Sequence, residues 1–516
     1  MLEKLPDSSW SHKTARHLLS RSWMWSSAVD RAQVYELGKK EGVEAAVSFI
    51  VDGQDDWDEF PFPEWWDGQD ISSGGPTGSP NDSEDRFTAW YANQLLDANP
   101  LGAKLFKFFV DHAPVDSRPL LHQNKFIYFF EHFDLCRRHA LGNFRDFISE
   151  LTWDGAMMWM LDMRSSSRGR LNENFGRELL ELFTMGVEGG YTEEDVVAVS
   201  RAFTGRKTDT QHPQDWPYKP YLNQEVWPTW PPDPEGPSTY YYYIDTLEKT
   251  FLGQTLTGFS PDDQDARKDH GEEIIEMIFN HPACGHYLSW KLWRYFVSPN
   301  PPMEMIKDLG DRWREVHHYE MRPLLKDIFT SAAFYDDSVI GNQIKDGADY
   351  FVSCLKSLGV KAPSPTLTFV LLDRLGYNPM YPPSIAGWPE PVGVGNAWIG
   401  PEKLLARANM PLLWTQETKQ FLPAANDYTK RSIVHEPVPS DFDLHELVPR
   451  HLMGRENIGL VIDELNQRLM PMHLISSEQR QLLIELYERD YRLLDDQTLL
   501  RELIRMMIAL PEFQLQ

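Results

Sequence analysis

The sequence predicts a mainly α-helical fold: a large multi-helix globular body with long aromatic, Pro-rich and acidic loops and little sheet. Apolar residues recur at helical spacing along the whole chain. Strict alternation of apolar and polar residues, which marks a half-buried strand, is scarce. Hydrophobic residues form 41% of the 516 residues, close to the globular average, so the chain can bury a sizeable core.

Residues 1–50 are predicted to form an N-terminal helical segment, and residues 83–420 the main helical domain. The first helix of that domain carries an apolar stripe with i, i+3, i+4, i+8 spacing: Phe87, Trp90, Tyr91 and Leu95. Asn99-Pro100 ends this helix and starts the next, because Pro is favoured at the first helical position. The helix through residues 126–139 is expected to end at Gly142, which can take the left-handed conformation.

Capping signals mark further helix starts. Thr192 followed by Asp195 resembles a capping box, in which each side chain bonds the backbone N–H of the other residue. Ser476 with Gln479 has the same pattern near the end of the chain. Three more helices are expected to begin at a proline: Pro282, Pro323 and Pro401.

Three segments interrupt the helical pattern. Residues 51–82 are rich in Asp, Gly, Pro and Ser and predict an exposed acidic loop. Residues 206–248 are dense in Pro, Trp and Tyr and predict an ordered aromatic loop inserted in the main domain. Residues 421–440 are interpreted as a connector to a C-terminal helical unit, residues 441–516.

The balance of charges restricts the class of partner. Acidic residues outnumber basic ones by 77 to 50, which gives a net charge of −27. A negative field of this size repels phosphate backbones, so no nucleic-acid partner is expected. It favours a cationic substrate or a basic protein surface, although solubility alone also accounts for it.

The chain as it stands is expected to be soluble and cytoplasmic. Residues 1–25 are charged and Trp-rich and lack the apolar core of a signal peptide. No apolar run is long enough to span a membrane. Cys136, Cys284 and Cys354 are too far apart in sequence for a zinc-site or redox-motif spacing, which fits a reducing compartment.

No motif indicates a cofactor. The chain contains no Walker A loop, no G-x-S-x-G elbow and no H-E-x-x-H helix. The identity of any cofactor therefore stays unknown from the sequence.

A distinctive stretch lies at residues 172–186, here named the signature segment: Asn-Glu-Asn-Phe-Gly-Arg-Glu-Leu-Leu-Glu-Leu-Phe-Thr-Met-Gly. Further landmarks follow in order, including Trp-Lys-Leu-Trp-Arg-Tyr-Phe-Val at 290–297 and Pro-Pro-Ser-Ile-Ala-Gly-Trp-Pro at 382–389. Together they resemble the pattern of a bacterial family catalogued as domain of unknown function 1800, from about residue 86 to the end of the chain.

The resemblance implies a mostly helical fold but no established activity. Members are often encoded beside a second family, domain of unknown function 1501, which suggests a protein partner. Members also often carry an export signal, so the resemblance leaves export open for this chain.

The chain departs from the family pattern at two histidines. Members tend to have Trp-His-Asn-His-Phe where this chain has Phe-Val-Asp-His-Ala at residues 109–113, so Val110 replaces the first histidine. Ile244 stands where members have a histidine before the Asp that matches Asp245. Imidazole is the commonest metal ligand and acid–base group. These losses weaken the case for metal or acid–base chemistry and indicate a divergent member.

The signature segment holds the candidate site residues. On a helical wheel Asn174, Glu178 and Glu181 share a polar stripe with Arg177 beside them. The apolar residues on the other side are Phe175, Leu179, Leu182 and Phe183. One interpretation is an ordinary amphipathic helix with i, i+4 ion pairs. The other is a cleft in which Glu178, Arg177 and His112 act in catalysis, or Asp111, His112 and Glu178 bind a metal. In the cleft arrangement Arg177 and Glu178 are buried and paired, with His112 or Asp111 within reach of Glu178.

The aromatic loop offers a second candidate. Its rings could stack on sugars, although they could equally hold the loop down; the ligand-binding candidates are Trp216, Tyr218, Trp227 and Trp230.

Three functions are therefore considered. A component of a protein complex is favoured because this function requires the fewest specific residues. The missing histidines weaken the case for an enzyme of hydrolytic or metal-assisted type. The missing export signal weakens the case for a glycan-binding protein.

Overall fold

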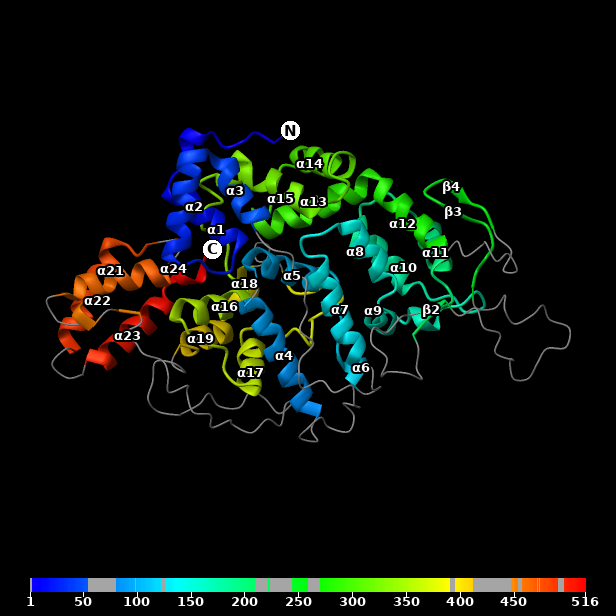
Figure 1. Ribbon diagram of the computed structural model, residues 1–516. Coiled ribbons are helices and arrows are strands. Elements are labelled where there is room, and N and C mark those ends of the chain that lie inside the picture. The colour runs from blue at the N-terminus through cyan, green and yellow to red at the C-terminus, as the bar shows by residue number, and fades with distance from the viewer. Residues whose placement is uncertain are drawn as a thin grey trace.

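The computed structural model is helical over most of the residues that it describes, which confirms the predicted mainly α fold (Figure 1). The structure describes residues 2–53, 80–97, 99–121, 126–208, 221–222, 244–258, 270–389, 395–411, 447–448, 450–452, 457–470, 472, 474–490 and 496–516. Among these residues, no helix has both the length and the apolar character that a membrane crossing requires.

The N-terminal helices form one packed group, drawn in blue in Figure 1. They are α1 (His12–Ser22), α2 (Ala28–Glu41) and α3 (Val43–Asp52), preceded by the short 3-10 helix η1 (Asp7–Ser9). Ser11 and Ser27 begin α1 and α2 with capping boxes. Helix α3 packs against α15 (Met321–Thr330), so this group covers one side of the main body.

The main body is a succession of helices. Its first part consists of α4 (Pro80–Asp97), α5 (Pro100–His112), α6 (Arg118–Leu121), α7 (Phe126–Arg138), α8 (Phe144–Leu151), α9 (Gly155–Met160), η4 (Met163–Ser165), α10 (Asn174–Glu178), the π-helical turn η5 (Leu179–Thr184) and α11 (Glu193–Ala202). Its second part consists of α12 (His270–Asn280), α13 (Pro282–Phe296), α14 (Met303–Glu315), α15, η7 (Ala332–Tyr335), α16 (Gly347–Leu358), α17 (Pro365–Arg374), α18 (Gly395–Ile399) and α19 (Pro401–Asn409).

Two small antiparallel sheets interrupt the helices. Strand β1 (Arg206–Lys207) pairs with β2 (Tyr221–Leu222), and β3 (Lys249–Phe251) pairs with β4 (Gln254–Leu256). Strand β3 packs against α11. The turn between β3 and β4 has positive φ at both central positions, Leu252 (48°) and Gly253 (73°), as a tight two-residue hairpin requires.

The C-terminal helices lie at the opposite end of the molecule from α10 and α11 (Figure 1). They are η9 (Arg450–Leu452), α21 (Ile458–Leu469), α22 (Ser477–Asp490), α23 (Asp496–Ala509) and α24 (Pro511–Gln514). Arg468 Nε donates a 2.9 Å hydrogen bond to the Ser357 carbonyl, which ties α21 to α16. Leu515 forms a backbone bridge with Ile344 and returns the chain to the main body.

A buried network of charges joins α5 to the start of α16. Lys104 Nζ lies 2.6 Å from Asp349 Oδ2, and Lys107 Nζ lies 2.5 Å from Asp346 Oδ2. These four side chains are at most 2% exposed. The Tyr295 hydroxyl from α13 donates to the Lys104 carbonyl at 3.0 Å. Burying four charges is costly unless they are paired in this way, so the network specifies how these helices meet.

Most capping predictions are confirmed. The Asn99 side chain accepts from the Gly102 N–H with Pro100 at the first helical position, Thr192 and Asp195 form a capping box, and Ser476 and Gln479 exchange hydrogen bonds of 2.8 and 3.1 Å.

Two helix boundaries differ from the predictions. Helix α7 ends at Arg138, not at Gly142, and Gly142 does not take a positive φ. Helix α15 begins at Met321, so Pro323 is its third residue and not its first. A proline is tolerated as either the first or the third residue of a helix, because the N–H groups of the first turn have no partner within the helix. The sequence therefore could not show at which of these two positions Pro323 lies.

Several predicted segments lie largely outside the described residues: most of the acidic loop 51–82, most of the aromatic loop 206–248 and the whole connector 421–440. The division into residues 1–50, 83–420 and 441–516 stays a prediction. The three cysteines lie buried as free thiols in α7, α13 and α16.

Candidate functional site

The signature segment forms a helix that changes its winding partway along. Asn174–Glu178 is α-helical and Leu179–Thr184 continues as a π-helical turn. Phe175, Leu179 and Phe183 of the predicted apolar side are buried in the core together with Leu180, whereas Leu182 is only half-buried. The segment ends at Gly186 with φ 76°, where a Cβ would lie 2.5 Å from the Tyr287 ring. Glycine is therefore required there by both conformation and space.

Side chains of two other helices satisfy carbonyls at the end of this segment. The Tyr287 hydroxyl of α13 donates to the Leu182 carbonyl at 3.2 Å. His112 Nε2, at the end of α5, lies 3.1 Å from the Phe183 carbonyl. Carbonyls in the last turn of a helix lack partners within it, and π-helical turns occur often at functional sites. The signature segment is thus held in place by α5 and α13.

His112 meets the main chain of the signature segment. Its side chain is buried against the rings of Phe108, Phe144 and Phe183. Burial lowers the pKa of His112 well below its ordinary value, and Lys291 lowers it further. The ring is therefore neutral and donates from Nε2 to the Phe183 carbonyl, while no described residue bonds its buried Nδ1. This contact is structural, and it differs from the predicted pairing of His112 with Glu178.

Asp111 belongs to the buried network described above. Its Oδ2 lies 2.9 Å from Lys107 Nζ, and the Tyr377 hydroxyl donates to Oδ1 at 2.8 Å. Burial raises the pKa of Asp111 to about 6, against the opposing charge of Lys107. The chain passes close to this point, because a Cβ on Gly387 would lie 2.2 Å from the Asp111 carbonyl oxygen. Asp111 thus joins α5 to the segment that carries the 382–389 landmark.

Arg177 is paired differently from the prediction. Its guanidinium donates to both carboxylate oxygens of Glu193, at 2.9 and 2.7 Å, and lies 3.6 and 3.5 Å from Glu173 and Glu181. The Arg177 side chain is 33% exposed and that of Glu193 is 72% exposed. The predicted buried pair of Arg177 with Glu178 is therefore wrong. The long side chain of Arg177 keeps its charged end near water, where it can contact three surface carboxylates.

Glu178 is half-buried and forms no ion pair with another described residue. Among the described residues, none donates a hydrogen bond to its carboxylate. Burial raises the pKa of Glu178, and repulsion from Glu181 adds to the effect, while Arg177 opposes it. The nearby Tyr191 hydroxyl also has its pKa raised, to about 12, by burial and by these carboxylates. The carboxylate of Glu178 is thus the one in this group without an ion-pair partner among the described residues.

These environments predict opposite effects of two substitutions on stability at pH 7. Arg177→Met is expected to lower the free energy of unfolding by less than about 1 kcal/mol, because exposed ion pairs contribute little. Glu178→Gln is expected to leave it unchanged or raise it, because the raised pKa means that folding disfavours the charged form. Urea unfolding followed by circular dichroism measures both, and a loss above about 2 kcal/mol for either variant would restore the buried-pair interpretation.

The structure does not bring the proposed metal ligands together. Within the part of the chain that the structure describes, no three His, Cys, Asp or Glu side chains form a group that could hold a metal ion. Asp111 bonds Lys107 and Tyr377, and His112 bonds the Phe183 main chain. The four aromatic candidates Trp216, Tyr218, Trp227 and Trp230 lie outside the described residues.

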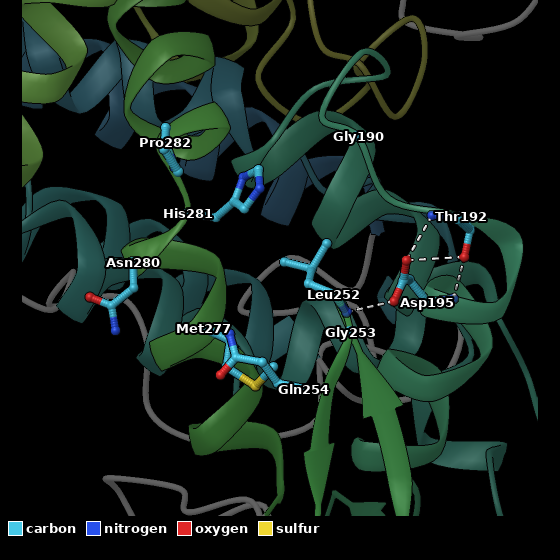
Figure 2. Close-up of a pocket in the computed structure, with 10 residues that line it drawn as sticks. All are labelled: Gly190, Thr192, Asp195, Leu252, Gly253, Gln254, Met277, Asn280, His281 and Pro282. Atoms are coloured by element: carbon cyan, nitrogen blue, oxygen red, sulfur yellow. Dashed lines mark hydrogen bonds between the residues drawn. The ribbon is translucent and has the colours of Figure 1, made fainter.

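A pocket that the sequence did not indicate lies just beyond the signature segment (Figure 2). Its volume is about 450 Å³. We name it the hairpin pocket, and it is lined by Gly190, Thr192, Asp195, Leu252, Gly253, Gln254, Met277, Asn280, His281 and Pro282. These residues come from the start of α11, the β3–β4 turn and the α12–α13 corner. Gly190 and Gly253 both have positive φ and open space around a Cβ. A glycine in the sequence can indicate such a backbone position, but it does not indicate a pocket.

Comparison with known proteins gives a family but no characterised relative. The family model described as protein of unknown function, DUF1800, matches residues 25–515. No curated protein and no solved structure matches the chain. The match covers nearly the whole sequence and includes the signature segment, the α5 end that holds it, and the hairpin pocket. The chain belongs to the DUF1800 family of proteins of unknown function.

Proposed function

We propose that this protein is a component of a protein complex and that the signature segment forms an acidic docking surface for a basic region of its partner. The observation that carries the proposal is Glu178: a half-buried carboxylate with a raised pKa and no donor among the described residues. Such a group costs free energy in the isolated chain, and a partner's Lys or Arg would offset that cost.

The surroundings of Glu178 extend the acidic surface. Residues 172–195 contain one basic residue, Arg177, which is already shared among three carboxylates. Five more glutamates accompany Glu178 in this stretch: Glu173, Glu181, Glu188, Glu193 and Glu194. Each of the five is at least partly exposed. A concentrated surface of one sign directs the approach of an oppositely charged partner and selects against others.

The resemblance to the family suggests which partner to test. Its members are often encoded beside a protein of domain of unknown function 1501, and neighbouring genes often encode proteins that act together. We therefore propose a protein of that family from the same genome as the partner.

The test is a binding measurement on the two proteins, expressed and purified separately. Isothermal titration calorimetry should show a complex whose affinity falls as salt rises, because exposed charges are screened. Reversing two charges, Glu178→Lys with Glu181→Lys, is expected to weaken binding tenfold or more, about 1.4 kcal/mol. Glu488→Lys serves as the matched control, because Glu488 is exposed on α22 at the other end of the molecule (Figure 1).

Three outcomes are informative. Binding that weakens with Glu178→Lys and Glu181→Lys but not with Glu488→Lys supports the proposal. Equal weakening per reversed charge in the double variant and in Glu488→Lys would reduce the effect to net charge. No complex at all would reject the proposed partner.

One observation favours an enzyme as the second candidate. The raised pKa of Glu178 beside Glu181 is what a general acid or base requires. Against it, His112 is engaged with the main chain and its pKa is lowered, so the imidazole proposed to act with Glu178 is not available for that role. The glycan-binding candidate depends on loop residues that lie outside the described part of the chain.

A further inference from the structure

The hairpin pocket has a polar donor above an apolar floor. His281 begins α13, and its Nδ1 accepts the Ala283 N–H at 3.3 Å. Burial lowers the pKa of His281, and the charges of Arg314 and His286 act in the same direction. The ring is therefore neutral at pH 7 with its proton on Nε2. Figure 2 shows this ring projecting from the α12–α13 corner, with the Leu252 side chain across the pocket from it, and no described residue accepts from Nε2.

The wall opposite His281 is strained. Leu252 has φ 48°, a conformation that costs a non-glycine residue about 1 kcal/mol or more. Asp195 holds it there, because Asp195 Oδ1 accepts the Leu252 N–H at 2.7 Å. Strain maintained by a specific contact often marks a functional position. Here it presents the Leu252 side chain, together with Met277, to the pocket.

The charges around the pocket are already used. Both Asp195 oxygens are engaged, one by Leu252 and the other by Thr192 through its N–H and hydroxyl at 2.9 and 3.0 Å. Two helix N-termini meet here, but they do not form an anion site. Pro282 has no N–H, the N–H groups of Ala283 and Cys284 bond His281, and three acidic residues occupy the first turn of α11.

We infer that the hairpin pocket binds an uncharged, extended peptide segment, whose apolar side chain packs on Leu252 and Met277 and whose backbone carbonyl accepts from His281 Nε2. A volume of about 450 Å³ is within the range of pockets that hold one such unit. The exposed amides of Gln254 and Asn280 at the rim suit further backbone hydrogen bonds. A sugar ring is the poorer fit, because none of the residues that line the pocket is Phe, Tyr or Trp.

The partner's identity rests on the proposed function, but the pocket can be tested without the partner. Val187, three residues before Gly190, is 72% exposed, so an apolar residue of the bound segment could extend towards it. A partner docked on the acidic surface would bring its chain to this side of the molecule, because the pocket residues Gly190 and Thr192 directly precede the acidic start of α11.

The test uses N-acetyl-leucine N-methylamide as the probe and the full chain labelled with ¹⁵N-histidine. Titration is expected to shift the His281 ring resonances, assigned by their loss in His281→Asn, with saturation on the order of 1 mM for a ligand of this size. N-acetyl-leucine, an anion, and leucine N-methylamide, a cation, are expected to bind at least threefold more weakly. The pocket offers no free charge to either.

Two variants separate the pocket from nonspecific effects. His281→Asn keeps a side chain that can cap α13 but removes the Nε2 donor, and Met277→Trp fills the floor. Methyl resonances of the probe should report at least fivefold weaker binding to both. His451→Asn, in η9 of the C-terminal helices, is the matched control and should bind as the unaltered chain does. Thermal melting shows whether each variant is folded. If Met277→Trp does not fold, His281→Asn alone tests the pocket assignment.

The results also separate this inference from the proposed function. Glu178→Lys with Glu181→Lys should leave probe binding unchanged, so a chain that binds the probe but not the partner rejects the proposed function alone. No saturable shift up to 20-fold above the expected value, on the order of 20 mM, or equal binding by His281→Asn, would overturn the pocket assignment. Equal binding of the charged probes would overturn its neutral specificity.

Discussion

Replacing Lys104 by Met is expected to lower the free energy of unfolding by about 3–5 kcal/mol, the usual cost of breaking a buried ion pair. Lys104 and Asp349 are 1% and 0% exposed and their charged atoms lie 2.6 Å apart. Burial acts to raise the pKa of Asp349, but the ammonium groups of Lys104 and Lys107 outweigh it and lower that pKa. Asp349 therefore stays ionised at neutral pH, and the variant leaves it short of a cation. Urea unfolding followed by tryptophan fluorescence measures the loss.

Lys307→Met is the matched control for this experiment. Lys307 pairs with Glu304 on the surface of α14, where the side chains are 49% and 90% exposed. Its loss should cost less than about half a kcal/mol. The double variant Lys104→Met with Asp349→Leu should recover part of the stability, because it removes the stranded carboxylate. A Lys104→Met variant as stable as Lys307→Met would show that the buried network does not hold α5 to α16.

Asp154→Asn is expected to cost about 3 kcal/mol at pH 6, with a penalty that shrinks as the pH rises. His132 Nδ1 lies 3.1 Å from Asp154 Oδ1, and both side chains are buried. Burial lowers the pKa of His132, but Cys136 and Asp154 outweigh it and raise it to about 10. Burial also raises the pKa of the Cys136 thiol, so the thiol is neutral and Asp154 supplies the charge.

The direction of the pH dependence follows from the raised pKa of His132. A histidine whose pKa is higher in the folded state contributes stability that is fully present below its unfolded pKa, about 6.5. That contribution is lost as the pH rises towards 10. The gap between the original chain and Asp154→Asn should therefore be largest at pH 6 and smallest at pH 10. Other titrating groups are common to both proteins and cancel in the difference.

Asn is chosen because Asp154 has two roles. Its Oδ1 also accepts the Met157 N–H at 2.7 Å and caps α9, and Asn caps helices about as well as Asp. Glu150→Gln is the control, since Glu150 bonds His139 at 3.0 Å but is 47% exposed. Its cost should stay below about 1 kcal/mol. A gap for Asp154→Asn that does not change with pH would mean that His132 is neutral in the folded protein.

The candidate site could be predicted in part. The signature segment was correctly expected to be a helix with Phe175 and Phe183 on its buried side, because the 3.6-residue period appears directly in the order of residues. The ion pairs predicted for Arg177 were confirmed only in part. Arg177 does contact Glu173 and Glu181 at i, i+4 spacing, but its shortest contacts go to Glu193, sixteen residues away. The turn that brings Glu193 back is not encoded by helical spacing.

The sequence by itself determined the helical class and the positions where many helices begin. Asn99, Thr192 and Ser476 cap their helices as expected, because a cap is a bond between residues two or three apart and needs no tertiary contact. The family pattern also follows from residue order alone.

Only the tertiary structure decided where the charges and the pocket lie. Lys104 meets Asp349 across 245 residues, and His112 meets the Phe183 carbonyl across 71. The hairpin pocket combines three separate stretches, which contribute Gly190, Leu252 and His281. Such contacts depend on how whole helices pack, and a spacing rule along one helix carries no information about the helix opposite. The position of Lys104 in a predicted helix therefore does not indicate whether its side chain faces water or, as in this structure, a buried carboxylate.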